Sequence, residues 1–163
     1  MIEIRRAILE DQSEILAIYN EAVLNSTATF DTEPRSFEKQ LEWFVSHKVN
    51  HPVFVAIENN TIVGWASLSP YSDRCAYETT VEVSVYIHYE HRGKKIGSKL
   101  LDVITLEGGK VNNHTIISRI TSDNLASIHI HAKLGYKHAG VLKEVGIKFG
   151  KKMDVLFMQY LFN

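Results

Sequence analysis

A short turn in the middle of the chain brings glycines and basic side chains together just ahead of a predicted helix. The turn reads Arg92-Gly93-Lys94-Lys95-Ile96-Gly97-Ser98 and follows a strand over 81–87. A helix N-terminus offers unpaired N–H groups and the positive end of a dipole, and glycine lets an anion approach the backbone closely. The turn therefore predicts a pyrophosphate site, although a glycine turn between a strand and a helix also forms without a ligand.

This turn differs from two widespread phosphate-binding loops. Only three residues separate Gly93 from Gly97, and no Gly-Lys-Ser/Thr triplet follows, so the turn is not the P-loop of nucleoside triphosphatases. It also lacks the Gly-x-Gly-x-x-Gly pattern of dinucleotide-binding folds. The pattern argues against both of these classes of nucleotide-binding protein.

The strand ahead of the turn and the loop before that strand carry further polar candidates. Apolar and polar residues alternate strictly from Val81 to Ile87, and the polar ones are Glu82, Ser84 and Tyr86. This alternation predicts one polar face and one core face. In the loop, the guanidinium of Arg74 matches a carboxylate or phosphinate bidentately. Arg74 is a candidate anchor for an acidic substrate, or an ordinary surface arginine.

The histidines and the single cysteine indicate no metal or nucleophile chemistry. His129 and His131 are two residues apart on a predicted helix and cannot face one metal ion. No zinc-ligand spacing occurs among the others, which include His47, His51, His88, His91, His114 and His138. We expect no metal cofactor. Cys75 has no nucleophile signature and cannot form an intramolecular disulfide, which favours a reducing compartment.

Hydrophobic periodicity predicts the elements that position these residues. Strands are expected over 2–6, 53–57, 62–68, 81–87, 116–120 and 155–161. One helix is expected to begin with a capping box of Asp11 and Glu14, and a second near Ser36. A third is expected to end at Gly108-Gly109, and a fourth to begin at a cap of Ser122-Asp123. The order β-α-α-β-β-β-α-β-α-β-β predicts an α+β (three-layer α/β) fold with helices on both faces of a mixed sheet.

Composition bounds the class of protein. The 163 residues predict one domain, 1–163, and 45 % apolar with 23 % charged residues is ordinary for a globular chain. Eighteen Lys and Arg against 19 Asp and Glu leave a net charge of −1, which argues against nucleic-acid and anionic-membrane partners. No apolar run approaches the ~18 residues of a membrane span. We expect a cytoplasmic protein.

Two segments at the expected separation resemble signatures of one family. Arg92 to Gly97 is similar to the Arg/Gln-x-x-Gly-x-Gly/Ala acyl-CoA signature of the GCN5-related N-acetyltransferases (GNAT). The segment Asn124 to Tyr136 resembles the family's second signature, a helix that ends in Gly-Phe or Gly-Tyr. The resemblance implies the GNAT fold, with a mostly antiparallel central sheet, and acetyl-CoA as co-substrate.

Four further segments, 29–34, 74–77, 80–87 and 145–150, resemble the phosphinothricin and methionine sulfoximine acetyltransferases within this family. This narrower resemblance implies acetylation of the α-amine of a small amino-acid-like acceptor, by direct transfer in a ternary complex, and a homodimer. Three alternatives stay open: a different acceptor such as a protein N-terminus or polyamine, a non-catalytic acyl-CoA-binding regulatory module, and a nucleic-acid-binding domain, which the net charge disfavours.

The sequence departs from the family signature at two positions. Lys95 stands where the acyl-CoA signature usually has glycine, and a lysine adopts positive φ only with strain. His131 stands where many members of the wider family carry a tyrosine, and the phosphinothricin-type subgroup often has histidine there.

The resemblance implies acid–base roles for three side chains. Glu82 takes the place of a family carboxylate close to the substrate amine and would accept its proton, directly or through a water. Tyr86 and His131 are alternative donors of the proton that the leaving thiolate needs. From the residues alone, Glu82 is also consistent with a solvated or ion-paired strand carboxylate, and His131 with a packed helix residue.

For acetyl-CoA, the resemblance implies three contact regions. The backbone of Val85, Tyr86 and Ile87 would bind the pantetheine arm and polarise the thioester carbonyl. Arg92 to Ser98 would hold the pyrophosphate. Asn124 and Ser127 would contact the pantetheine region, although spacing alone is also consistent with Asn124 capping the helix together with Asp123.

Several segments would surround the acceptor. Phe30 and Thr32 would form one wall, Arg74 and Tyr77 would face its acidic group, and Lys148 and Phe149 would close the pocket, within the chain or across a dimer interface. The strand would add the last three substrate-binding residues, Glu82, Val83 and Ser84.

Overall fold

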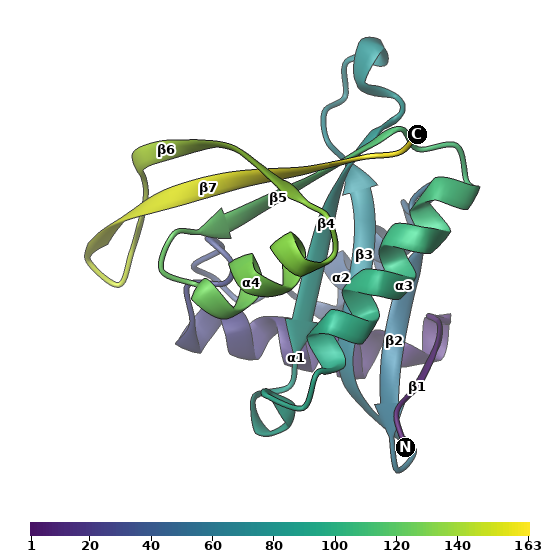
Figure 1. Ribbon diagram of the computed structural model, residues 1–163. Coiled ribbons are helices and arrows are strands. Elements are labelled where there is room, and N and C mark those ends of the chain that lie inside the picture. The colour runs from purple at the N-terminus through teal and green to yellow at the C-terminus, as the bar shows by residue number, and fades with distance from the viewer.

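One seven-stranded sheet in the order β1-β2-β3-β4-β5-β7-β6 runs through the computed structural model, which describes all 163 residues (Figure 1). All neighbouring pairs are antiparallel except β4 and β5, which are parallel. The predicted mixed, mostly antiparallel sheet is therefore confirmed. The strands are β1 (Glu3–Arg6), β2 (Val53–Glu58), β3 (Thr61–Pro70), β4 (Thr80–Ile87), β5 (Thr115–Thr121), β6 (Lys137–Lys148) and β7 (Lys151–Leu161).

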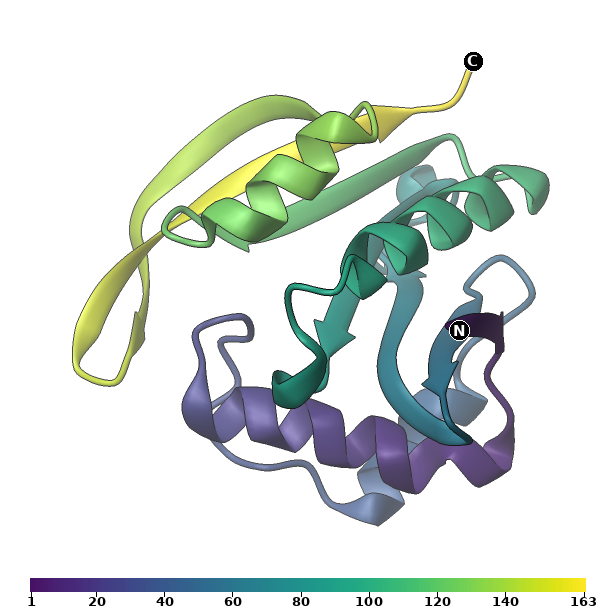
Figure 2. The same cartoon turned by 60° about the horizontal axis from the view of Figure 1, so that its bottom comes forward.

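Helices cover both faces of the sheet, which confirms the three-layer α+β architecture. Helices α1 and α2 lie on one face, and α3 and α4 lie on the other (Figures 1 and 2). None of these helices is long and apolar enough to cross a membrane. Their bounds are α1 (Gln12–Asn25), α2 (Phe37–Val45), α3 (Ile96–Lys110) and α4 (Leu125–Lys133), with short 3-10 turns η1 (Leu9–Asp11), η2 (Cys75–Tyr77) and η3 (Tyr89–His91).

A hydrophobic cluster lies on each face of the sheet. On the α3 face, Leu68 of β3 packs with Leu100 and Ile104 of α3, all fully buried. On the α1 face, Trp65 of β3 packs with Ile15 of α1. Since both faces are covered, β2 and β3 read as continuous apolar runs and show no alternation of polar residues.

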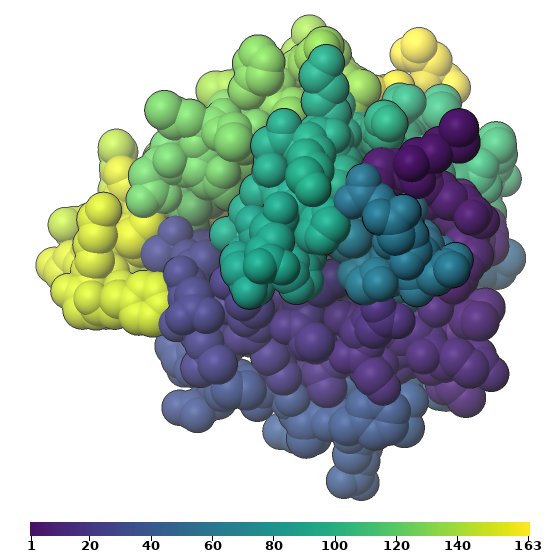
Figure 3. All heavy atoms as spheres, turned by 90° about the horizontal axis from the view of Figure 1, so that it is seen from below, coloured from purple at the N-terminus to yellow at the C-terminus, as the bar shows by residue number.

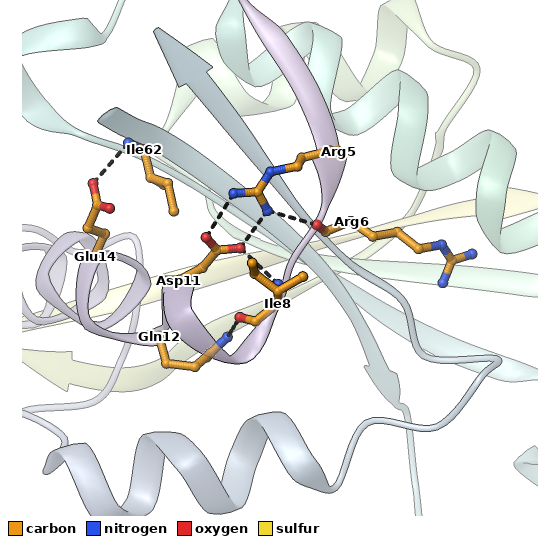
Figure 4. A network of polar contacts seen from close by, with 7 residues as sticks. All are labelled: Arg5, Arg6, Ile8, Asp11, Gln12, Glu14 and Ile62. Carbon is orange, nitrogen blue, oxygen red and sulfur yellow. Dashed lines mark hydrogen bonds and ion pairs between the residues drawn. The ribbon is translucent and has the colours of Figure 1, made fainter. Parts of the chain in front are cut away.

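The predicted capping box at the start of α1 is wrong. The Asp11 carboxylate accepts hydrogen bonds from Arg5 Nη1 (2.7 Å), Arg5 Nη2 (2.9 Å) and the Ile8 N–H (2.8 Å), as Figure 4 shows. The Glu14 carboxylate accepts from the Ile62 N–H of β3 at 2.9 Å. Both carboxylates thus tie α1 to neighbouring segments, and neither caps the helix.

The prediction that α3 ends at Gly108-Gly109 is wrong, because the helix includes both glycines and continues to Lys110. A Cβ on Gly108 would lie 2.7 Å from Leu68 Cδ1, and one on Gly109 would lie 2.7 Å from Phe162 Cε1. The two glycines therefore permit close packing of α3 on neighbouring elements.

The sheet splits between β4 and β5. Their parallel pairing covers three residue pairs and ends at Glu82 and Ile117, although β4 continues to Ile87 and β5 continues to Thr121. Beyond that point the two strands diverge (Figure 1). The end of β4 consequently has no β5 partner, and its backbone on that side faces a gap.

Candidate active site

A cavity of about 440 Å³ occupies this split. It is bounded by β4, β5, β7, α4, the loop after α1 and the β6–β7 hairpin, whose tip lies beside that loop in Figure 3. Nine of the residues predicted from the sequence line it, and these are Phe30, Glu82, Val83, Ser84, Val85, Tyr86, Asn124, Ser127 and His131. The split therefore brings together the predicted acid–base residues, part of the predicted cofactor site and part of the predicted acceptor site.

The two faces of the sheet contribute different chemistry to the cavity. Alternation along β4 places Glu82 and Tyr86 on the α1 face and Val83 and Val85 on the α4 face. His131 of α4 lies on the latter side. Apolar side chains complete the wall near the β6–β7 hairpin and are Phe30, Leu142, Val145, Val155 and Phe157.

A bidentate ion pair joins the two strands where they separate. Arg119 Nε of β5 donates to Glu82 Oε1 at 2.9 Å, and Arg119 Nη2 donates to Glu82 Oε2. The Glu82 side chain is 21 % exposed and that of Arg119 is 52 % exposed. The hydrogen bond to Glu82 raises the pKa of Arg119 above its usual range. Glu82 is thus an ion-paired carboxylate, one of the two plainer alternatives open from the sequence, and it still borders the cavity.

Tyr86 stands in an aromatic cluster at the base of the cavity. Its ring centroid lies 5.4 Å from that of Tyr19 and 4.9 Å from that of Trp65. Its hydroxyl has one long hydrogen bond, 3.4 Å to the Ala28 carbonyl. Burial raises the pKa of this phenol well above its usual value, so Tyr86 keeps its proton throughout the neutral range.

His131 is buried, and both of its ring nitrogens are engaged. Nδ1 lies 2.7 Å from the Ser127 carbonyl, and Nε2 lies 3.0 Å from Ser118 Oγ. Burial lowers the pKa of His131, so the ring is neutral at pH 7. Nδ1–H therefore donates to Ser127, and Nε2 accepts from the Ser118 hydroxyl.

The glycine turn precedes α3 at the end of β4. Gly93 and Lys95 both have positive φ, 78° and 64°, and Lys95 is the residue that precedes the first turn of α3. Arg92 Nη2 lies 3.0 Å from Glu21 Oε2, and Lys94 Nζ lies 3.9 Å from Glu58 Oε2. The N–H groups of the first turn of α3 have no partner within the helix and face this turn. Lys95 has a positive φ, which lysine adopts only with strain.

None of the residues from Arg92 to Ser98 lines the cavity, but Gly97 of this turn lies against α4 and the end of β4. A Cβ on Gly97 would lie 3.6 Å from Ile130 Cδ1 of α4 and 3.7 Å from Ile87 Cγ1 of β4, so the start of α3 fits between these elements. At the start of α4, Asn124 accepts from the Ser127 N–H at 3.2 Å. The cap is therefore Asn124, which confirms the capping role left open for this residue, and the predicted cap of Ser122-Asp123 is wrong.

The predicted acceptor residues outside the cavity lining fall into three places. Lys148 is 3 % exposed, and its Nζ donates to the Thr29 carbonyl at 2.8 Å, which ties the hairpin to the loop after α1. Phe149 is 63 % exposed, and Thr32 is exposed outside the cavity wall. Arg74 and Tyr77 line a second, more open hollow of about 390 Å³, together with Tyr71, Ser72 and Arg119.

The sequence did not predict most of the other residues that line the cavity, and two of these are the polar partners of Glu82 and His131. Arg119 and Ser118 lie on β5, where they read as ordinary strand positions, and only the fold brings them against Glu82 and His131. No local motif marks either residue.

Comparison with known proteins defines the class. The family model described as an acetyltransferase (GNAT) domain matches residues 4–157. An L-methionine sulfoximine/L-methionine sulfone acetyltransferase of Salmonella typhimurium is 36 % identical over 157 residues, which are 96 % of this chain and 92 % of that protein. An L-amino acid N-acyltransferase of Escherichia coli is 35 % identical over 159 residues, 97 % of this chain and 92 % of that one.

A solved structure agrees with these matches. The acetyl-CoA complex of a phosphinothricin acetyltransferase from Sinorhizobium meliloti superposes with a TM-score of 0.95 at 33 % identity and covers 98 % of this chain and 88 % of that one. The chain belongs to the GNAT acetyltransferase family. It is an N-acetyltransferase, and acetyl-CoA is its co-substrate. The resemblance seen in the sequence is thereby confirmed.

Proposed function

We propose that this enzyme acetylates the α-amine of a small amino-acid-like acceptor of the methionine sulfoximine, methionine sulfone or phosphinothricin type. The names of its relatives support this class of acceptor. The observation that carries the proposal is the composition of one cavity: a carboxylate and a guanidinium, Glu82 and Arg119, stand beside an apolar wall. These groups complement an ammonium, an acidic group and an aliphatic side chain.

Residues on the α4 side of the split would position acetyl-CoA. The backbone of Val85, Tyr86 and Ile87 has no β5 partner and would bind the pantetheine amides and the thioester carbonyl. The N–H groups and side chains of Arg92 to Ser98 would hold the pyrophosphate. Asn124 and Ser127 line the same cavity and would contact the pantetheine.

Glu82 would act as the general base. It accepts the proton of the acceptor's ammonium, directly or through a water, so that a neutral nitrogen attacks the thioester carbonyl carbon. The C–N bond forms, and the attacking nitrogen then gives up its second proton to solvent. The C–S bond breaks, and the thiolate leaves and is protonated. N–H groups at the end of β4 would stabilise the negative charge that develops on the carbonyl oxygen.

Of the two proton donors proposed for the thiolate, we favour Tyr86. Its phenol keeps its proton, and the 3.4 Å hydrogen bond to the Ala28 carbonyl is long enough to be exchanged for a contact with the thiolate. His131 is neutral, and its one N–H is committed to the Ser127 carbonyl. We assign His131 the role of orienting Ser118 in the cavity wall.

The test of this function is the variant Glu82→Gln, which keeps the size of the side chain and removes its basicity. We expect kcat to fall by about 100-fold or more, as is typical of general-base removal, with the acetyl-CoA Kd nearly unchanged. Glu38→Gln is the matched control, because it makes the same change at an exposed glutamate of α2 outside the cavity. Equal losses of turnover and acetyl-CoA affinity would argue against a base role for Glu82.

We also propose that the enzyme is a cytoplasmic homodimer. The edge strand β6 is exposed along almost its whole length and carries apolar side chains toward solvent. Unpaired edge strands of this kind favour association with another chain. The exposed apolar residues of β6 and of the turn after it are Val141, Leu142, Val145, Ile147 and Phe149. Sedimentation analysis, with a charged substitution at Ile147, tests this assembly.

A further inference from the structure

Arg119 is the one residue shared by the two hollows described above. It lines the cavity in the split with Glu82, and it lines the open hollow with Arg74, Tyr71, Ser72 and Tyr77. It lies two residues beyond Ile117, the last β5 residue that pairs with β4. Its guanidinium therefore stands between the position proposed for the reacting amine and a pocket that holds a second arginine.

The ion pair occupies the carboxylate that the reaction needs. Both oxygens of Glu82 accept from Arg119, one from Nε at 2.9 Å and the other from Nη2. A carboxylate whose two oxygens both accept from one guanidinium cannot offer that same edge to an ammonium. The positive charge of Arg119 also repels an incoming ammonium. In this arrangement the Glu82 edge that faces Arg119 is closed to the acceptor's ammonium.

The open hollow offers a place where an acidic group of the acceptor can compete with Glu82 for Arg119. Arg74 and Arg119 are its two cationic lining residues, and the hydroxyl-bearing residues Tyr71, Ser72 and Tyr77 complete the lining. No carboxylate lines this hollow. An acidic group that entered it would meet two cations with only Glu82 to compensate them, so it would compete with Glu82 for Arg119.

We propose that Arg119 is a specificity-determining residue that exchanges Glu82 for the acidic group of the acceptor. The acceptor's carboxylate binds Arg119 from the side of Arg74, and Glu82 is released toward the ammonium of the same molecule. Glu82 then accepts one proton from that ammonium, and Arg119 keeps its own protons. This inference rests on the proposed function, since it assumes an acceptor that carries both an amine and an acidic group.

The exchange makes a prediction that a purely structural ion pair does not. An acceptor without an acidic group cannot displace Glu82, so the wild-type enzyme uses it poorly. Removal of Arg119 frees Glu82 permanently. The variant should then lose its preference for acidic acceptors and acetylate the neutral analogue faster than the wild type does.

The experiment compares L-methionine sulfone with its α-amide, which differ only in the carboxylate. For the wild type we expect kcat/KM to be about 10-fold or more higher for the acid than for the amide, because the acid makes a charge-assisted bidentate contact that the amide lacks. In Arg119→Gln the ratio should fall to within about 3-fold, with kcat/KM for the amide raised. Arg119→Lys keeps the charge without the planar fork and should be intermediate.

Controls separate this role from folding and from net charge. Arg6→Gln removes one arginine charge on β1, where Arg6 pairs with Glu107 at 3.7 Å, and should leave the acid-to-amide ratio unchanged. Thermal unfolding reports whether each variant is folded, and Arg119→Lys serves if Arg119→Gln is not. Equal loss of kcat/KM for both acceptors, or an unchanged ratio in Arg119→Gln, would overturn the proposal.

Failure of the proposed function is distinguishable from failure of this inference. If the wild type acetylates neither compound, the acceptor assignment is wrong, and calorimetric binding of the same two compounds to the CoA-loaded enzyme decides the role of Arg119. Tighter binding of the acid, lost in Arg119→Gln, supports an anion subsite at Arg119. Equal binding of acid and amide to the wild type overturns it.

Discussion

Lys95 supplies a prediction whose size follows from its backbone. The residue has φ 64° and ψ 13°, in the left-handed region, and its side chain makes no cap hydrogen bond. A non-glycine residue in this conformation costs roughly 1–2 kcal/mol relative to the right-handed form. We expect Lys95→Gly to remove that cost.

The net gain is smaller than the relieved strain. Glycine adds unfolded-chain entropy that offsets about 0.4–1 kcal/mol. The expected stabilisation is therefore about 0.5–1 kcal/mol. For a chain of this size 1 kcal/mol corresponds to about 2–4 °C, so Tm should rise by roughly 1–4 °C.

Lys95→Ala is the matched control, because alanine removes the ammonium group and keeps the strained backbone. Thermal unfolding should rank Lys95→Gly above both Lys95→Ala and the wild type, with the last two nearly equal. Calorimetry should show the same change in acetyl-CoA affinity for both variants if the ammonium alone contributes to binding. A glycine variant no more stable than the alanine variant would refute the assignment of strain to Lys95.

Two further predictions concern the cavity wall and the start of α1. A Cβ at position 146 would lie 2.7 Å from Phe30 Cδ2, so Gly146→Ala should displace that ring from the cavity wall. Steady-state kinetics should show the acceptor KM raised roughly fivefold, which corresponds to about 1 kcal/mol. The acetyl-CoA Kd should be unchanged in a binding assay. Burial raises the pKa of Asp11, but the hydrogen bonds from Arg5 and Ile8 outweigh it and hold that pKa below its usual value. The contribution of ionised Asp11 to the free energy of unfolding is therefore fully present above about pH 4, and it is lost as the pH falls through the lowered pKa of the folded state. Denaturant unfolding at several pH values should show that Asp11→Asn has a free energy of unfolding about 1–3 kcal/mol below that of the wild type near neutrality, and that this difference shrinks in acid. A difference that does not change with pH would contradict this reasoning.

Much of the fold could be predicted from local patterns. Strict alternation over 81–87 identified β4 and its polar face, and the glycine turn ahead of an apolar helix identified the start of α3. These signals are local because strand and helix periods depend on which side chains face a core. The polar residues that the alternation marked, Glu82, Ser84 and Tyr86, line one cavity, whereas the glycine turn lies outside its lining.

The failures share a physical cause. Asp11 and Gly108 have the residue types of a helix cap and a helix stop, yet their partners are Arg5 and Leu68, which belong to other elements. Arg119 reads as an exposed strand residue, and its pairing with Glu82 depends on the parallel register of β4 and β5. Contacts of this range follow from the tertiary arrangement, and one sequence holds no local signal for them.

The most direct test of the central claim is steady-state thiol release from acetyl-CoA with methionine sulfoximine, methionine sulfone, phosphinothricin, ordinary amino acids, a polyamine and a peptide N-terminus. We predict robust turnover on the first three acceptors and little or none on the polyamine and the peptide. No turnover on the first three, with acetyl-CoA still bound in calorimetry, would contradict the assigned acceptor while the family and its co-substrate stand.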